Sequence, residues 1–172
     1  MVVNGSILRN HKPIVGMSAT KQSGPGGASY GLGEAGYDIR IKQDIHFKAV
    51  EGHVYPQHNG RYVSVDGETY ERGRFALASS LEEFDMPDDL MGIVHDKSTW
   101  ARRGLSVFNT VIEPGWKGFL TLELVYHGEG ELIIPAGSGI AQVVFHLLAE
   151  EAEYTGKYQN QEDQPVSARD SV

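Results

Sequence analysis

Apolar and polar residues alternate in short runs along most of the chain, and this period of two is typical of β-strands with one buried face. In the segment 37–47 the apolar residues fall mostly on one parity. The same pattern predicts further strands at 61–65, 74–79, 90–94, 105–108, 119–125, 131–134 and 140–147. Turns are predicted between them at 66–67, 114–115, 128–130 and 135–138. With 21 glycines and 7 prolines in 172 residues, the sequence predicts an all-β domain with frequent turns.

Helical patterns are scarce. Short helical segments are predicted after Ser6, over 81–84 before Pro87, and as one turn that Ser98 caps and that runs through Arg102. Two segments have no periodic apolar pattern, namely the glycine-rich stretch 23–33 and the polar tail from about residue 154. We expect both to be mobile loops, and the tail to be either disordered or ordered by a ligand or partner.

Composition narrows the class of protein. A chain of 172 residues can bury one core, so a single domain over 1–172 is expected. The absence of cysteine excludes disulfides, thiolate zinc sites and a cysteine nucleophile. The start has no apolar stretch of signal-peptide length, and no run approaches a membrane span, so a soluble cytoplasmic protein is expected. The net charge of −8 argues against binding to nucleic acid, which requires clustered cations.

The segment 96–123 holds more polar side chains than a core-like region should. Lys97, Ser98, Arg102, Glu113 and Glu123 stand there among apolar residues. Burying such groups is costly unless they are paired, so we expect them to converge on a ligand. A nucleotide fits this mixture of cations, hydroxyl and carboxylates.

Two motif matches do not fit their chemistry. The residues 31–36 read GLGEAG and match a dinucleotide fingerprint, but a strand pattern follows where that motif needs a helix. His127 and Glu129 match the HxE of zinc deaminases, whose zinc shell also needs cysteines. We therefore interpret both as ordinary turn or loop residues.

Longer blocks show a more specific similarity. The chain resembles the dCTP deaminase family in five ordered blocks, which read SYGLGEAGYDIR, KSTWARRG, VFNTVIEPGWKGFLTLEL, GSGIAQVVF and GKYQNQ. Four of them also have counterparts in the trimeric dUTPases of the same superfamily. The resemblance implies a distorted β-barrel or jelly-roll subunit of dUTPase-like type, with few short helices, assembled as a homotrimer with sites between subunits.

The resemblance also implies a reaction. It indicates a hydrolase that acts on the cyclic amidine C–N bond of dCTP and yields dUTP and ammonia, a step of pyrimidine deoxynucleotide metabolism. Magnesium is expected to enter on the substrate triphosphate, with no metal site of the protein's own and no zinc.

Glu123 matches the general acid/base of the family, which the dUTPases lack. Strand alternation places Thr121 and Glu123 on one face, so the sequence TLEL by itself would predict only a surface carboxylate. Ser98 and Arg102 match residues that hold the nucleophilic water or the departing ammonia. The substrate-binding residues that the resemblance implies are Lys97, Ser98, Thr99, Trp100, Ala101, Arg102, Thr121, Leu122, Glu123, Gln142, Tyr154, Lys157 and Gln161.

Glu113 distinguishes between the possible reactions. In dUTPases and bifunctional deaminases the matching residue is an aspartate, and a longer side chain displaces the carboxylate by about one methylene. Deamination alone is therefore favoured. The alternatives are a dUTPase or bifunctional enzyme that releases dUMP and pyrophosphate, and a non-catalytic nucleotide sensor. Asp38 is either the superfamily aspartate near the metal and phosphates or a turn residue at a strand start.

Overall fold

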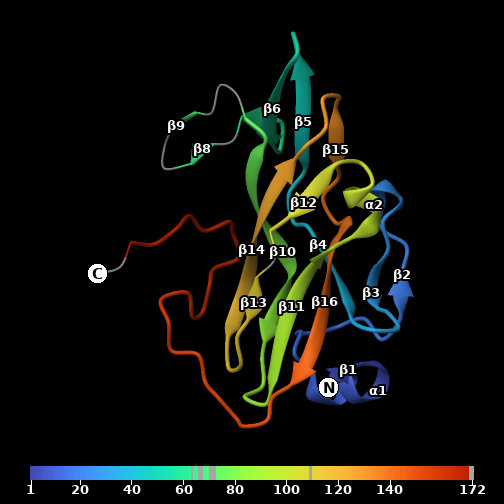
Figure 1. The fold of residues 1–172 in the computed structure, drawn as a ribbon, viewed down its shortest axis with the longest axis vertical. Helices are drawn as coiled ribbons and strands as arrows, with labels where there is room; N and C mark the ends of the chain where they lie inside the picture. Colours follow the sequence, from blue (N-terminus) through green and yellow to red (C-terminus); the bar gives the residue numbers. More distant parts are fainter. Residues whose placement is uncertain (63, 66–67, 70–72, 109, 171–172) are drawn as a thin grey trace.

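The fold is built almost entirely from β-strands, as the sequence predicts (Figure 1). A computed structural model describes residues 1–62, 64–65, 68–69, 73–108 and 110–170. In this part of the chain the only α-helices are two short ones, α1 (Gly5–His11) and α2 (Ser98–Ala101), and η1 (Pro25–Gly27) is a single 3₁₀ turn. None of these helices is long and apolar enough to cross a membrane.

The strands are short and follow one another closely. Those in the first half of the chain are β1 (Val2–Val3), β2 (Lys21–Gln22), β3 (Tyr30–Leu32), β4 (Tyr37–Arg40), β5 (Ile45–Val50), β6 (His53–His58), β7 (Arg61–Tyr62), β8 (Ser64–Val65), β9 (Glu68–Thr69) and β10 (Phe75–Asp85). Those in the second half are β11 (Leu90–Asp96), β12 (Leu105–Val107), β13 (Val111–Ile112), β14 (Lys117–Tyr126), β15 (Leu132–Ile134) and β16 (Gly139–Leu147).

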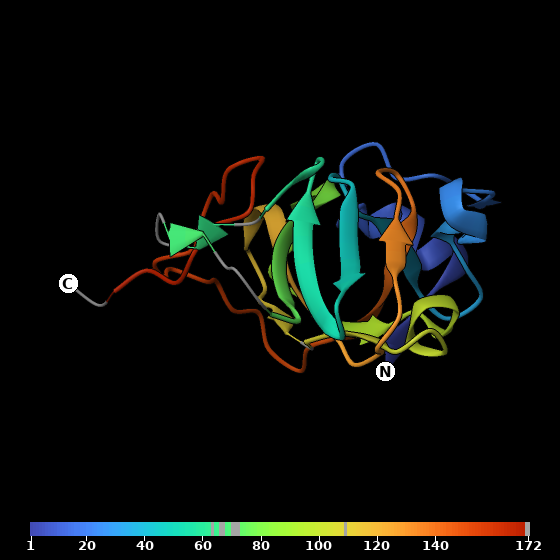
Figure 2. The ribbon, with the colours of Figure 1, turned by 90° about the horizontal axis from the view of Figure 1, so that it is seen from above.

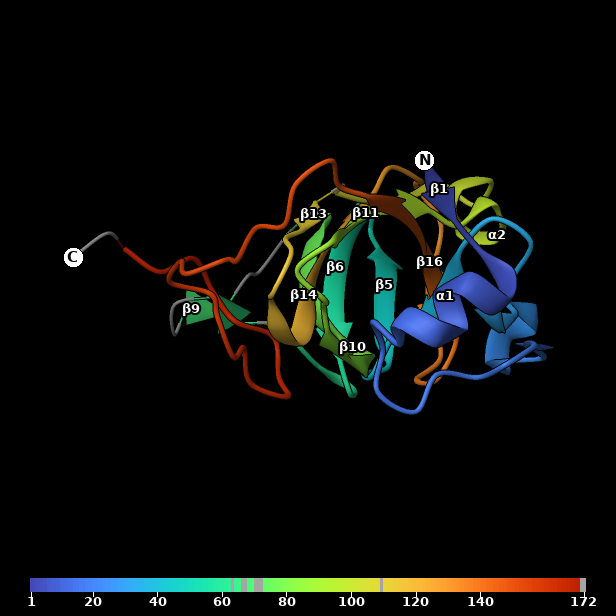
Figure 3. The same cartoon turned by 90° about the horizontal axis from the view of Figure 1, so that it is seen from below.

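Three sheets surround one apolar interior. The largest has the order β13-β11-β16-β4-β3-β2, with β1 also paired to β16. The others have the orders β10-β14-β12 and β15-β5-β6-β7, and β8 and β9 form a separate hairpin. Views from above and below show the strands enclosing this interior, with the C-terminal segment running outside it next to β14 (Figures 2 and 3). This is the distorted barrel that the sequence predicts.

The pairing of β10 with β14 is the longest in the molecule. The two strands are antiparallel from Phe75 opposite Val125 to Asp85 opposite Lys117, with one register shift between Ser79 and Glu83. β12 covers the other edge of β14, but only over its last three residues, 124–126. The first half of that edge is therefore open to another partner.

Trp100 anchors α2 to the barrel. Its side chain is 1% exposed, and its indole Nε1 donates a 2.7 Å hydrogen bond to the Gly139 carbonyl. Gly26 lies so close to the indole that a Cβ there would come within 3.1 Å of it. The exposed Arg103 covers the ring, with its Cζ 4.9 Å from the ring centroid. A four-residue helix has little stability of its own, so this packing holds it in place.

Two strand predictions need correction. The segment 37–47 is not one strand, because polar residues 42–44 break it into β4 and β5, which lie in different sheets. The segment 61–65 divides into β7 and β8, and the predicted turn at 66–67 lies outside the described residues. The alternating pattern did not predict β6, because Pro56, Gln57 and the two histidines at its ends interrupt its apolar residues.

The helix and loop predictions are correct only in part. The helix after Ser6 exists as α1, but 81–84 belong to β10, where exposed and buried residues alternate as a strand requires. Ser98 is the first residue of α2 and not its cap; Lys97 occupies the cap position without a side-chain cap hydrogen bond. The stretch 23–33 is not wholly a loop, because Tyr30–Leu32 pair with β2 and β4.

We expect Trp100→Phe to lower the free energy of unfolding by about 2–4 kcal/mol, because it leaves a cavity and removes the only indole donor to the Gly139 carbonyl. Chemical denaturation of purified protein measures the change. Arg103→Gln is the matched control, since it removes the exposed cation from the ring face and should cost under about 1 kcal/mol. Equal stability of the two variants would contradict this account of α2.

Candidate active site

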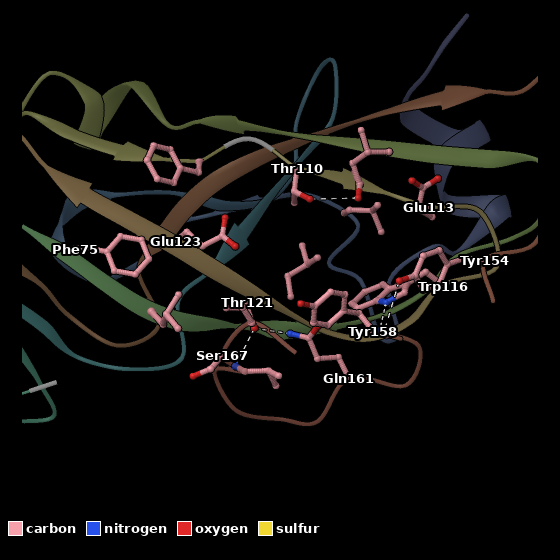
Figure 4. A pocket seen from close by; sticks show the side chains of 17 residues that line it. Phe75, Thr110, Glu113, Trp116, Thr121, Glu123, Tyr154, Tyr158, Gln161 and Ser167 are labelled. Carbon is pink, nitrogen blue, oxygen red and sulfur yellow. Dashed lines mark hydrogen bonds between the residues drawn. The ribbon is translucent and has the colours of Figure 1, made fainter. Parts of the chain in front are cut away.

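A cavity of about 590 Å³ lies between β14, β10 and the C-terminal segment (Figure 4). Its lining residues are Phe75, Leu77, Phe108, Thr110, Val111, Ile112, Glu113, Trp116, Leu120, Thr121, Glu123, Tyr154, Tyr158, Gln161, Val166, Ser167 and Ala168. The volume is in the range of small-molecule sites. The lining combines apolar walls with a few polar groups, which is the usual composition of such a site.

Glu123 is the carboxylate at one end of the cavity, close to Phe75 in the view of Figure 4. It stands on β14 directly opposite Leu77 of β10, and its carbonyl accepts a 3.0 Å hydrogen bond from the Phe108 amide. The side chain is half-buried. Burial disfavours its charged form and raises the pKa of the Glu123 carboxyl above its usual value.

Thr121 contacts the C-terminal segment two residues earlier on the same face of β14. Its hydroxyl oxygen accepts hydrogen bonds from the Gln161 side-chain amide and, at 3.0 Å, from the Val166 backbone amide. Gln161 itself is 8% exposed. These contacts bring a tail residue to within two strand positions of Glu123.

Aromatic side chains gather at the other end of the cavity, near Glu113 (Figure 4). The Trp116 indole donates a 2.7 Å hydrogen bond to the Tyr158 carbonyl. The Tyr154 hydroxyl accepts one of 3.3 Å from the Tyr158 amide. Glu113 is exposed and is separated along the cavity from Glu123. The two carboxylates therefore stand at different ends of the cavity.

A second polar cluster surrounds α2. Lys97 Nζ lies 2.5 Å from Asp38 Oδ2, and both side chains are largely buried, with 10% and 3% exposed. Asp38 lies within β4, so it is not a turn residue, and its carboxylate neutralises the Lys97 ammonium. Ser98 and Arg102 are exposed on the outer side of α2. Among the side chains that the structure describes, none forms an ion pair with Arg102.

The structure brings together only some of the residues implied by the sequence. The cavity is lined by four of them, Thr121, Glu123, Tyr154 and Gln161. The described lining includes none of the residues 97–102. Gln142 pairs with Asp38 across β16 and β4, which places it with the α2 cluster.

The remaining residues that the resemblance implies lie outside the cavity lining, either with buried side chains, on the C-terminal segment or on α2. The side chains of Trp100 and Leu122 are buried in the core, 1% and 2% exposed, so only their backbone groups could meet a ligand. Lys157 is exposed, and its ammonium donates to the Arg169 carbonyl. Thr99 and Ala101 lie on α2 with Ser98.

Several cavity residues are absent from the sequence-based prediction. Phe75, Leu77 and Phe108 form the apolar surroundings of Glu123, and Tyr158 and Val166 close the tail side. The alternating pattern around these residues predicts strands, but it does not show which strand residues line a cavity. Phe75, Phe108 and Val111 are 38%, 52% and 45% exposed in the structure, so the apolar wall faces outward, but no pattern in the sequence marks these residues as exposed.

The described residues contain no group of three or more histidine, aspartate or glutamate side chains that could hold a metal ion. The expected absence of a protein-bound metal remains a prediction.

Comparisons with known proteins agree with the geometry. The family described as dCTP deaminase-like matches residues 20–148. A dCTP deaminase of Campylobacter curvus is 37% identical over 166 residues, covering 90% of this chain and 89% of the relative. A dCTP deaminase of Campylobacter concisus is 38% identical, covering 88% and 87%.

Solved structures share the fold at low sequence identity. A mutant dUTPase from phage phi11 of S. aureus, described with a coordinated structural Mg(II) ion, has a TM-score of 0.50 and 13% identity, covering 72% of this chain and 84% of that one. This similarity confirms the dUTPase-like type of barrel. The family match and the full-length relatives show that the chain belongs to the dCTP deaminase-like family.

Proposed function

We propose that the protein hydrolyses dCTP to dUTP and ammonia, with Glu123 as the general acid/base. The observation that carries this proposal is a half-buried carboxylate with a raised pKa inside a nucleotide-sized cavity. A raised pKa suits a group that must first accept and then donate a proton near neutral pH. The family membership supports the same reaction.

The reaction places defined demands on Glu123. As water attacks C4 of cytosine, the carboxylate takes a proton from it and transfers that proton to N3. A second proton transfer through the carboxyl group allows the C4–N bond to break and ammonia to leave. The protons balance, since dCTP and water give dUTP and ammonia. The apolar neighbours Leu77 and Phe108 contribute to the partial burial that raises the pKa of Glu123.

The separation of Glu123 from Ser98 and Arg102 supports a site between subunits. Within one chain the cavity lacks the α2 cations that a triphosphate and the reacting centre need. The exposed Ser98 and Arg102 are free to face a neighbouring copy. A homotrimer, in which each cavity receives α2 from the next subunit, meets this need.

Magnesium enters this proposal only as part of the substrate. Phosphate oxygens are hard ligands that hold it with waters, so no dedicated protein cage is required. Lys97 and Lys157 are the ammonium groups proposed to meet the phosphates, and release of Lys97 from Asp38 would accompany that contact. Zinc has no proposed role, and the proposed location is the cytoplasm.

A second candidate reaction is pyrophosphate release by a dUTPase-like or bifunctional enzyme. The dUTPase-like barrel favours it, whereas Glu113 in place of the expected aspartate argues against it. A nucleotide sensor without catalysis is the third candidate. The raised pKa of Glu123 argues for turnover, because simple binding does not need it.

Native protein incubated with dCTP and magnesium should release ammonia and accumulate dUTP, with little dUMP or pyrophosphate, because Glu113 misplaces its carboxylate for attack on the phosphate chain. Chromatography of nucleotides with ammonia and pyrophosphate assays gives the product ratio. Glu113→Asp should add at most a trace of pyrophosphate release. One pyrophosphate per dCTP from the native protein would replace this proposal with the bifunctional one.

Glu123→Gln should lower kcat by about a thousandfold or more, because the amide keeps the shape but cannot cycle a proton. Binding of dCTP, measured by calorimetry, should remain within about tenfold of native. The exposed Glu129→Gln is the matched control and should turn over dCTP normally. Near-native turnover by Glu123→Gln would exclude it as the acid/base.

Mixing subunits tests the shared site. Glu123→Gln and Arg102→Gln should each be inactive alone, and an equal mixture refolded together should recover about a quarter of native activity, since one site in four then has both native halves. Light scattering should report a trimer throughout. No recovery from a mixture shown to exchange subunits would place both groups in a site formed by one chain.

A further inference from the structure

We propose that Gly118 is a positioning residue that seats the C-terminal segment on β14 and thereby holds Gln161 against Thr121, in the cavity that also contains Glu123. The inference rests on the proposed function for its kinetic consequence, but the seating itself can be measured without substrate. It assigns a role to a glycine that lies outside the cavity lining and touches neither the nucleotide nor the reacting atoms.

The first evidence is a stretch of parallel pairing between the tail and β14. Gly118 and Gln161 form a parallel β-bridge. The Phe119 amide donates a 3.1 Å hydrogen bond to the Gln161 carbonyl, and the Gln161 amide donates one of 3.3 Å to the Lys117 carbonyl. The tail thus pairs with the half of the β14 edge that β12 leaves uncovered. In Figure 3 it follows this outer side of β14.

The second evidence is the space at Gly118. Its φ is +128°, a backbone conformation that side chains disfavour. A Cβ built there would lie 2.5 Å from both the nitrogen and the oxygen of Gln161. Both are backbone atoms, so no side-chain rotation can relieve the overlap. Any residue other than glycine at 118 must push the tail away from the strand.

The third line of evidence is the register in which the C-terminal segment pairs with β14. With Gln161 opposite Gly118, the Gln161 side chain reaches forward along β14 to the Thr121 hydroxyl, which also accepts from Val166 (Figure 4). Thr121 and Glu123 share one face of the strand, so the amide of Gln161 is held on the cavity wall that also carries the proposed acid/base. The bridge and the Thr121 hydroxyl act as two attachment points of one tail segment.

The two attachment points reinforce each other. Ordering a segment costs conformational entropy, and a tail held at one point leaves its side chains free to move. Fixing Gln161 before the nucleotide arrives reduces the cost of binding, which should appear mainly in KM. Loss of Gly118 should therefore produce the same defect as loss of the Gln161 side chain.

The primary test is a double-mutant cycle on the full-length protein. Gly118→Ala and Gln161→Ala should each raise KM for dCTP by about tenfold with a smaller change in kcat. The KM of the double variant should be no higher than that of either single variant, because both substitutions remove the same contact between Gln161 and β14. Independent, multiplying effects would overturn the proposal. Gly130→Ala is the matched control, since a Cβ there meets nothing within 4 Å, and it should behave as native.

A second readout needs no substrate. Hydrogen exchange of the Phe119 amide should accelerate at least about tenfold in Gly118→Ala, because its acceptor belongs to the tail, while amides of β14 paired to β10 keep their protection. Unchanged exchange at Phe119 would overturn the seating. Absence of dCTP turnover by the native protein would refute the proposed function, and the exchange result would still decide the seating.

A third pair of variants covers the case in which Gly118→Ala does not fold. Thr121→Val removes the acceptor of Gln161 and Val166 without changing the backbone, and it should loosen the tail and raise KM. Thr121→Ser keeps the hydroxyl and should restore both values. A Thr121→Val protein with native KM and native tail exchange would overturn the proposal.

Discussion

The pairing of β14 on both of its edges is the constraint on which the site depends. β10 covers one edge along nearly the whole strand, and the other edge is divided between β12 and the C-terminal segment. An unpaired strand edge is a row of unsatisfied backbone groups, so this division satisfies them while leaving room between tail and strand. The cavity lies in that room. Its floor is the face of β14 that carries Thr121 and Glu123.

The charged side chains beside α2 and those in the cavity differ in how they are paired. Beside α2, Lys97 and Asp38 neutralise each other almost completely out of solvent. Among the described residues, Glu123 has no ion-pair partner in the cavity, and burial raises its pKa. Within one chain the first cluster contains a neutralised ion pair, whereas the cavity contains a carboxyl group with a raised pKa. That contrast favours Glu123 as the reactive group.

The barrel fixes the strands on which the polar side chains of the cavity stand. The similarity to a phage dUTPase structure at 13% identity concerns the barrel alone. Under the proposed function, the reaction depends on single side chains at set positions, such as Glu123 on β14 and Glu113 at the turn before it.

The all-β class, most strand positions and the family could be predicted from the sequence, because alternation and ordered motifs are local properties of the chain. It also placed Thr121 and Glu123 on one face of a strand, which the cavity confirms. It could not show that 81–84 continue β10, since that strand gains its stability from pairing with β14. Nor could it find the seat of Gln161 against Gly118, or the apolar wall of Phe75, Leu77 and Phe108. Those features join residues far apart along the chain, and only the tertiary structure decides which distant groups meet.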